Sequence, residues 1–182
     1  MRIYLIGYMY SGKTTLGRQL AARLGLPFHD LDQMLEARYH STVPLLFERY
    51  GEAAFRQLER AMLHSTAQLE HAVIATGGGT PCHFDNMDFI LAHGTAIYLE
   101  LTADDILRRA LRSHKPRPLL SGLTEEEQRK VIERQLKERE PYYRRAPYVW
   151  SDKRGSNPRP AAWEAAALPT ELLSLLSDTR PI

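Results

Sequence analysis

Hydrophobic residues fall into short continuous runs, and the segments between them have helical spacing. Apolar runs of strand length lie at residues 1–6, 72–76, 95–101 and 146–150. After the first run, Leu16, Leu20 and Leu24 recur every four residues, as on one face of a helix. Continuous apolar strands that alternate with amphipathic helices are typical of a parallel sheet covered on both faces. The pattern therefore predicts an α/β fold.

A further strand is expected to end in the segment Phe28–Asp32. In an extended chain Asp30 and Asp32 point to the same side, because side chains alternate with a period of two. At the carboxyl end of a parallel strand that side faces a ligand crevice. The alternative is that one of the two aspartates caps the following helix, predicted over residues 33–39.

Helical segments are also predicted further along the chain. Gly25 and Pro27 end the first helix, and Thr124–Glu127 has the pattern of a capping box that opens a later one. The other predicted elements are helices at residues 44–69 with a break at Gly51, 102–111, 124–140 before Pro141, 161–168 and 171–175, and a turn at 155–158. Without an internal repeat or a second composition class, residues 1–182 are expected to form a single domain.

Composition narrows the functional class. The chain has 24 Lys and Arg against 22 Asp and Glu, so a net charge of +2 gives no bulk field for nucleic acid. The lone cysteine, Cys82, rules out an internal disulfide and is interpreted as a small packed residue. Only four apolar or aromatic residues lie between Arg2 and Gly7, too few for a signal-peptide core or a membrane span. We expect a soluble protein of the cytoplasm, with no nucleic-acid or membrane partner.

The clearest chemical motif is Gly7–Thr14, which fits the P-loop pattern G-x-x-x-x-G-K-[ST] between a strand and a helix. Such a loop wraps its backbone N–H groups around phosphate oxygens at a helix N-terminus, where the dipole favours an anion. Lys13 would reach the β- and γ-phosphates, and the Thr14 hydroxyl would hold Mg²⁺. The motif predicts binding of ATP or GTP; the alternative is an ordinary glycine turn beside a surface lysine.

Two other segments have features that suggest a ligand. The run Gly77–Gly79 follows a buried strand, and three glycines favour close approach of a ligand to the backbone. The basic residues from Arg108 to Arg117 lie in a segment that is broken by Pro116, Pro118 and Gly122, which favours a lid that closes over phosphates rather than a solvated loop. Considered alone, Arg56 reads as a surface residue, and Arg139 as a cation suited to a helix C-terminus.

Together these segments resemble the shikimate kinase family. The resemblance spans residues 1 to about 158 and is carried by six stretches: the P-loop, Asp30-x-Asp32, Phe55-Arg56, Gly77-Gly78-Gly79, Arg117-Pro118-Leu119-Leu120, and Arg139-x-Pro141-x-Tyr143-Arg144. It implies a P-loop fold like that of nucleoside-monophosphate kinases, with a five-stranded parallel sheet. It also implies a lid at about 112–123, a substrate-binding helical segment at about 32–62, and a monomer. The implied reaction transfers the γ-phosphate of ATP to the 3-hydroxyl of shikimate.

The resemblance also implies a role for each matching residue. The expected catalytic residues are Lys13, Asp32 and Arg117. Shikimate would be bound by Asp32, Arg56, Gly78, Gly79 and Arg139, with the two arginines on its carboxylate. ATP would be bound by Tyr10, Ser11, Gly12, Lys13, Thr14, Thr15, Arg109, Arg117, Asn157 and Pro158. Mg²⁺ would be held by Thr14 and Asp30, with Thr76 near its water shell.

Two positions depart from the family pattern. Tyr10 stands where a second P-loop glycine is usual, and Ser156 stands where Arg or Gln often lies near adenine. The last 25 residues match no part of the pattern. Two alternatives stay open at this point: a kinase for another hydroxylated acid such as gluconate, and a regulator that binds ATP without turnover. The paired arginines and the triple glycine favour shikimate, and the retained Lys13 and Asp32 favour an enzyme.

Overall fold

The computed structural model describes residues 1–113, 120 and 122–151. Its elements in chain order are β1 (Arg2–Ile6), α1 (Lys13–Leu24), β2 (Phe28–Asp30), α2 (Leu31–Tyr39), α3 (Val43–Ser65), the 3₁₀ helix η1 (Thr66–Gln68), β3 (Ala72–Ala75), a second 3₁₀ helix η2 (Thr80–Cys82), α4 (Asn86–His93), β4 (Thr95–Glu100), α5 (Ala103–Arg112), α6 (Glu125–Tyr143) and β5 (Tyr148–Ser151). Among these helices none is long and apolar enough to cross a membrane.

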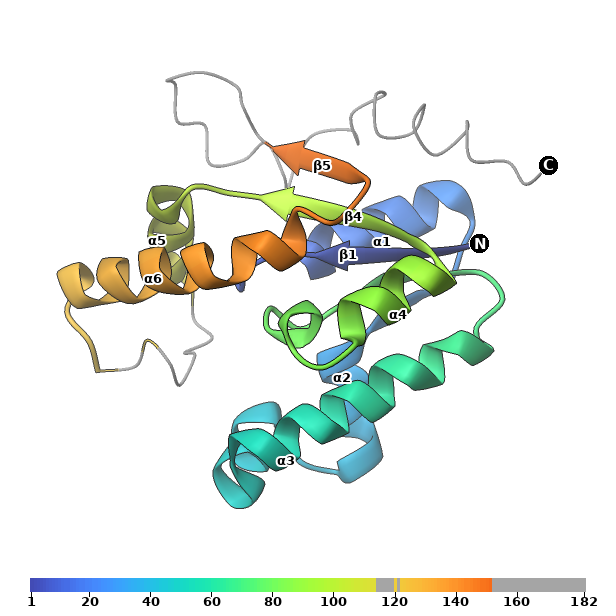
Figure 1. Cartoon of the computed structure of the whole chain (residues 1–182), viewed down its shortest axis with the longest axis horizontal. Coiled ribbons are helices and arrows are strands. Elements are labelled where there is room, and N and C mark those ends of the chain that lie inside the picture. The colour runs from blue at the N-terminus through green and yellow to red at the C-terminus, as the bar shows by residue number, and fades with distance from the viewer. Residues whose placement is uncertain (114–119, 121, 152–182) are drawn as a thin grey trace.

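The five strands form one sheet in the order β2-β3-β1-β4-β5, and every neighbouring pair is parallel. The first strand lies at the centre, where Ile3 is in register with Val73 of β3 and Thr95 of β4 (Figure 1). Because parallel strands end at the same edge, the loops that follow β1, β2 and β3 meet there. The prediction of a five-stranded parallel sheet flanked by helices is confirmed.

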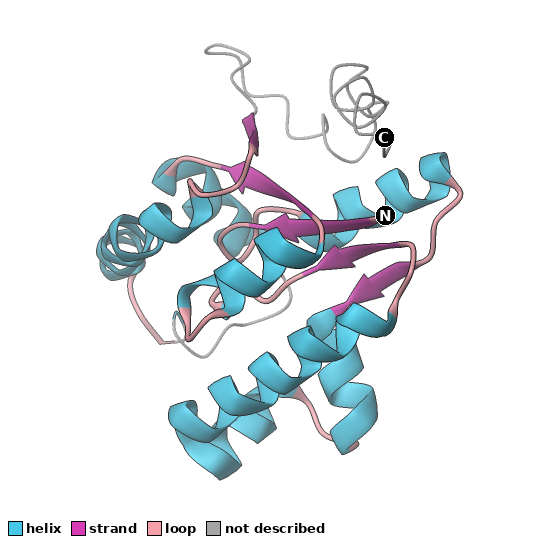
Figure 2. Cartoon of the chain, turned by 45° about the vertical axis from the view of Figure 1, so that its right-hand side comes forward, coloured by secondary structure: helices cyan, strands magenta, loops and turns pink. Residues whose placement is uncertain are grey.

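Helices cover both faces of the sheet (Figure 2). Ile3 and Leu5 of β1 pack with Leu20 of α1 on one face, and Tyr4 and Ile6 pack on the other, as the period of two requires. All five side chains are fully buried. The central strand is therefore apolar on both faces, which is why its sequence is a continuous hydrophobic run.

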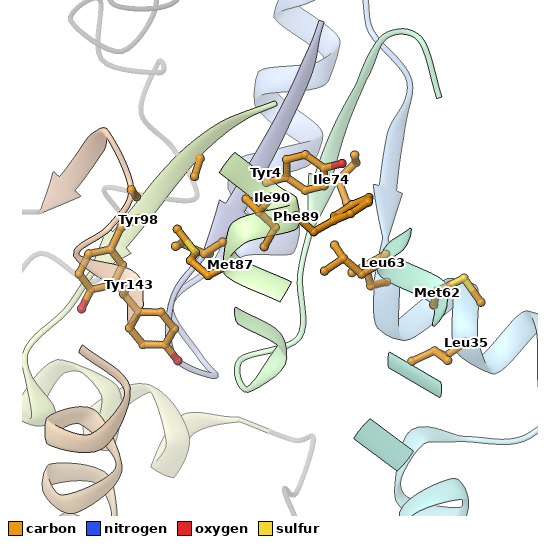
Figure 3. Close-up of a cluster of buried hydrophobic side chains, with 14 of the residues drawn as sticks. Tyr4, Leu35, Met62, Leu63, Ile74, Met87, Phe89, Ile90, Tyr98 and Tyr143 are labelled. Atoms are coloured by element: carbon orange, nitrogen blue, oxygen red, sulfur yellow. The ribbon is translucent and has the colours of Figure 1, made fainter. Parts of the chain in front are cut away.

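The larger core joins the sheet to α2, α3, α4 and the end of α6 (Figure 3). Leu35 and Leu63 contribute from α2 and α3, and Ile90 contributes from α4; all three are fully buried. The ring of Tyr143 lies beside that of Tyr98, with 5.1 Å between centroids. This packing anchors both the α2–α3 segment and the end of α6 to one face of the sheet.

A third cluster lies between α5 and α6 and includes a residue of the P-loop. Its buried members are Tyr8, Leu101, Ile106, Leu107, Leu120 and Ile132. The cluster fixes the phosphate loop against α6, so the side chains of that helix have a defined position relative to the loop.

The predicted geometry of the two aspartates is wrong. Strand β2 ends at Asp30, whose side chain accepts hydrogen bonds from the backbone N–H of Asp32 and Gln33 and so caps α2. Asp32 is already in the first helical turn, not in an extended segment. The capping alternative holds for Asp30, and the helix begins two residues earlier than predicted because of it.

Several other boundaries also differ from the predictions. Helix α6 continues through Pro141 to Tyr143, and the short helix α4 was not predicted. The break at Gly51 is confirmed, with φ of 74° inside α3, and so is the capping box of Thr124 and Glu127. The predicted turn and helices after residue 151 lie outside the described residues, as do residues 114–119 and 121 of the predicted lid.

Candidate active site

The P-loop joins β1 to α1, and two of its residues, Tyr10 and Gly12, have a left-handed α conformation. Gly12 has φ of 89° and is the N-cap of α1, where it has no side chain to occupy the first-turn N–H groups. Tyr10 has φ of 64°, a region that costs a residue with a Cβ roughly 1–2 kcal/mol. The glycine usual at this position is therefore explained by backbone conformation, and the loop accommodates a tyrosine in the same conformation. The N-terminus of α1 remains available to an anion.

Lys13 is 8% exposed and turns back over the loop. Its Nζ donates to the carbonyl oxygens of Gly7 and Tyr8, both at 2.8 Å, and to Ser11 Oγ at 3.3 Å. Three oxygen partners hold one ammonium at the centre of the loop. The positive charge therefore lies where the loop N–H groups would hold a phosphate, as the motif predicts.

Thr14 and Asp30 lie together, as predicted. The Thr14 hydroxyl donates to Asp30 Oδ2 over 2.6 Å, while Oδ1 of the same carboxylate caps α2. Thr76 is buried at the end of β3, and its hydroxyl donates to the Leu5 carbonyl at 3.1 Å. Among the described residues no group of three or more His, Cys, Asp or Glu side chains could hold a metal. A hydroxyl beside one carboxylate is nevertheless the kind of oxygen pair that suits Mg²⁺, which usually keeps several waters.

The three consecutive glycines are required by neighbouring protein groups. A Cβ on Gly77 would lie 2.7 Å from Glu59 Oε1 and 3.1 Å from Asp32 Oδ1. One on Gly78 would lie 2.9 Å from the backbone nitrogen of Met9, and one on Gly79 would lie 2.8 Å from Arg56 Nη1. The prediction attributed the close approach to a ligand. The structure shows that the P-loop and the side chains of Glu59, Asp32 and Arg56 already occupy that space.

Arg56 is buried, so the interpretation of a surface residue is wrong. It is 9% exposed and donates to Glu59 Oε2 at 2.5 Å and to Glu52 Oε1 at 3.2 Å. Burial by itself would lower the pKa of the guanidinium, but the two carboxylates raise it above its ordinary value. Its buried Nε has no hydrogen-bond partner among the described residues. The side chain is therefore a fixed cation in the interior.

Arg139 comes from α6 and lies over the ring of Tyr8, 5.2 Å from its centroid. Burial raises the pKa of the Cys82 thiol to about 11, and the charges of Arg139 and Arg56 oppose that rise. The same two arginines add to the lowering of the His83 pKa that burial begins. Two guanidiniums from distant parts of the chain thus act on one short turn, η2. The raised pKa of Cys82 agrees with its interpretation as a packed residue.

Arg109, at the end of α5, also reaches the P-loop. Its Nη1 donates to the carbonyl oxygens of Tyr10 and Ser11, each at 3.3 Å. This places a cation of the predicted nucleotide set at the loop. Three other predicted nucleotide residues lie outside the described residues: Arg117, Asn157 and Pro158.

Sequence reasoning missed Glu59, Tyr8 and Tyr143 as parts of this site. Glu59 is 4% exposed and also accepts from Thr80 Oγ1 at 2.8 Å. The Tyr143 hydroxyl donates to the Gly78 carbonyl at 2.5 Å. The three-residue spacing of Arg56 and Glu59 was a usable signal for the ion pair. Tyr8 lies in the P-loop and Tyr143 in the last of the six family stretches, but no local pattern indicates their contacts, because their partners are far away in sequence.

Comparisons with known proteins identify the family of the chain. The family model "Shikimate kinase" matches residues 9–171. A shikimate kinase of Parabacteroides distasonis is 46% identical over 145 residues, which cover 80% of this chain and 84% of the relative.

Two solved structures of shikimate kinases are similar to the structure of this chain. The crystal structure of shikimate kinase from Bacteroides thetaiotaomicron superposes with a TM-score of 0.87 at 40% identity, covering 97% of this chain and 98% of the other. Shikimate kinase from Acinetobacter baumannii, in complex with shikimate, gives a TM-score of 0.82 at 35% identity, covering 99% of this chain and 95% of the other. The family uses ATP as a substrate, and its members are ATP-dependent small-molecule kinases. The chain has the P-loop and the buried arginine, and it matches the family model and its relatives over nearly its whole length. This chain therefore belongs to the shikimate kinase family.

Proposed function

We propose that the chain transfers the γ-phosphoryl group of ATP to the 3-hydroxyl of shikimate, giving shikimate 3-phosphate and ADP, through the residues described above. The observation that carries the proposal is the position of the two arginines beside the P-loop. Arg56 lies against Gly79, and Arg139 lies over the ring of Tyr8. The middle residue of the triple glycine touches the P-loop at Met9. These positions support a carboxylate-binding place beside the phosphate-binding loop.

The phosphate side of the site consists of the P-loop and Arg109. The N–H groups from Tyr10 to Thr15 would surround the phosphate oxygens, and Lys13 would move its ammonium from the loop carbonyls to the phosphates. Thr14 and Asp30 would hold Mg²⁺, and the ion would supply neutralisation of the phosphate charge. Arg117 from the lid would add a further cation, and Asn157 and Pro158 would border the adenine.

The acceptor side consists of residues from four elements. Arg56 and Arg139 would bind the shikimate carboxylate, since a guanidinium fork matches the two oxygens of a carboxylate. Asp32, beside Gly77, would orient the attacking hydroxyl and accept its proton. The backbone of Gly78 and Gly79 would support the ring. Because a phosphoryl transition state spreads charge over its oxygens, positioning and fixed cations supply most of the catalysis.

The proposal also includes a monomeric protein in the cytoplasm, a single domain over residues 1–182, a lid at about 112–123 and a substrate-binding segment at about 32–62. Sedimentation in the presence and absence of ligands tests the oligomeric state. Protection of the 112–123 segment from proteolysis by nucleotide plus shikimate tests the lid.

The experiment that tests the function is ADP release with ATP and Mg²⁺, and with shikimate, gluconate or no acceptor. The proposal predicts ADP release in the assay with shikimate and in neither of the other two, and product analysis should locate the phosphate on the 3-hydroxyl. Equal ADP release without an acceptor would mean an ATPase, and preference for gluconate would mean a different acceptor class. No ADP release, with intact nucleotide binding, would indicate a regulator.

A further inference from the structure

Tyr8 connects two parts of the site that are far apart in sequence. It belongs to the P-loop, and its carbonyl oxygen accepts from Lys13 Nζ. Its side chain is 2% exposed and extends to α6, where the hydroxyl donates to Gln135 Oε1 at 2.6 Å. The ring lies under the guanidinium of Arg139. One residue thus contacts the P-loop lysine through its backbone and the acceptor-side arginine through its ring.

The two contacts on α6 are one helical turn apart. Gln135 and Arg139 are four residues apart, so their side chains lie on the same face of the helix. Burial raises the pKa of the Tyr8 phenol to about 12, against the opposing charge of Arg139. The hydroxyl therefore stays protonated at physiological pH and remains a hydrogen-bond donor to Gln135. The ring at the same time presents its negative face to the cation above it.

A second set of contacts connects the same elements. The Tyr143 hydroxyl, also on α6, donates to the Gly78 carbonyl, and Gly78 lies against the backbone of Met9 in the P-loop. Burial raises the pKa of the Tyr143 phenol well above its ordinary value, and Arg139 opposes this rise through its charge and a hydrogen bond. Arg139 is therefore held between Tyr8 and Tyr143.

A purely structural role for Tyr8 would require only that its side chain fill space in the core. Tyr8 packs in the cluster between α5 and α6, and an aliphatic side chain such as leucine would fill much of that space. Leucine would supply neither the hydrogen bond to Gln135 nor the aromatic face under Arg139. The aromatic face contacts the arginine directly, and the hydrogen bond to Gln135 fixes the ring beneath it.

We propose that Tyr8 is a positioning residue that fixes Arg139 for the substrate carboxylate and so sets the acceptor site in register with the phosphate loop. Because this role rests on the proposed function of Arg139, its test must separate the two. Shikimate methyl ester serves this purpose, since it presents the same hydroxyl without a carboxylate charge.

The experiment compares kcat/KM for shikimate and its methyl ester in wild type, Tyr8→Leu, Tyr8→Phe and Tyr4→Phe. Tyr8→Leu should lower kcat/KM for the acid by roughly fivefold, mainly through KM, as loss of a cation–π contact implies. The value for the ester and the KM for ATP should stay within about twofold. Tyr8→Phe keeps the ring and should retain most of the preference for the acid.

Tyr4→Phe is the matched control. Tyr4 is also fully buried, on the strand β1 that leads into the P-loop, and its hydroxyl bonds Thr66 Oγ1 at 2.8 Å on the face of α3 and α4. Its removal should lower the melting temperature and leave the acid-to-ester ratio unchanged.

Two results would contradict the inference, and they differ from failure of the proposed function. If Tyr8→Leu lowers the acid and ester values by the same factor, or leaves both unchanged, Tyr8 does not act through Arg139. If the wild type shows no preference for the acid, the carboxylate-binding role of Arg139 is itself wrong. If Tyr8→Leu does not fold, the test uses Tyr8→Phe. An equal loss of kcat/KM for the acid and the ester in that variant counts against the inference.

Discussion

The phosphate side and the acceptor side of this site are built in different ways. The phosphate side is local: the eight-residue motif Gly7–Thr14, at the junction of β1 and α1, supplies the backbone N–H groups, the lysine and the threonine hydroxyl. The acceptor side, as proposed, takes Asp32 from α2, Arg56 from α3, Gly77–Gly79 from the end of β3 and Arg139 from α6. A local site depends on the conformation of one turn, whereas a dispersed site depends on the packing of several elements. Changes near the two sides should therefore differ in kind.

The largest effect is expected on the phosphate side. Lys13→Ala should lower kcat by at least about a hundredfold, the effect of removing one donor to developing charge. The fold should persist, because the lysine donates hydrogen bonds to oxygens of the loop itself and fills no part of the apolar core. Circular dichroism and ADP release measure the two properties separately. Arg18→Ala, on an exposed position of the same helix, should leave kcat unchanged; normal turnover in folded Lys13→Ala would remove the lysine from the mechanism.

On the acceptor side, Arg56→Lys and Arg139→Lys should each lower kcat/KM for shikimate by about ten- to a hundredfold, since charged hydrogen bonds of this kind contribute roughly 1.5–3 kcal/mol. Nucleotide affinity should be nearly unchanged. Steady-state kinetics with each substrate varied in turn checks both statements. Arg60→Lys is the control, because Arg60 lies one turn beyond Arg56 and pairs with exposed Asp85. Loss of ATP binding in the Arg56 or Arg139 variants would assign them to the phosphate side.

A smaller effect is expected when Arg56 is displaced rather than replaced. In Gly79→Ala the new Cβ would lie 2.8 Å from Arg56 Nη1, so the guanidinium must move. The KM for shikimate should rise roughly tenfold, as for a displacement of less than 1 Å, with the KM for ATP unchanged. Gly25→Ala has open space but φ of +66°. It should lower stability by about 1 kcal/mol without changing either KM. Unaltered kinetics in Gly79→Ala would show that the position of Arg56 is not limiting.

The smallest effect concerns stability far from either side. Arg60 holds the pKa of Asp85 down, at about 2, below an ordinary value of 3.8. A depressed folded-state pKa gives stability that is present above pH 4 and is lost as the pH falls toward 2. Asp85→Asn should therefore flatten the decline of the melting temperature in that range at low salt. If the melting temperature of the variant falls as steeply with pH as that of the wild type, other carboxylates cause the acid sensitivity.

The sequence predicts the local side of the site well and the dispersed side poorly, for physical reasons. A P-loop is specified by consecutive residues, so the positions of Lys13 and Thr14 follow from the motif and its strand–helix context. The burial of Arg56 depends on Glu59 and Thr80, and Thr80 belongs to another element. Only the family resemblance pointed to its role.

Errors in the fold have similarly specific causes. Asp30 was expected to extend a strand together with Asp32, but its side chain accepts hydrogen bonds from the backbone N–H groups of Asp32 and Gln33, and α2 therefore starts early. Helix α4 was missed because it has only eight residues, and its apolar side chains pack around it without a clear stripe. Tyr8 gave no signal because Gln135 lies 127 residues away.

The central claim is that Arg56 and Arg139 bind one carboxylate of the acceptor. The most direct measurement is the ratio of kcat/KM for shikimate to that for its methyl ester, in wild type, Arg56→Lys, Arg139→Lys and the double variant. Wild type should prefer the acid strongly, and each single variant should lose most of that preference while keeping its activity on the ester. The double variant should lose little more than either single one, because both arginines act on the same group. If wild type uses acid and ester equally well, or if the variants lose both substrates alike, the carboxylate site is wrong.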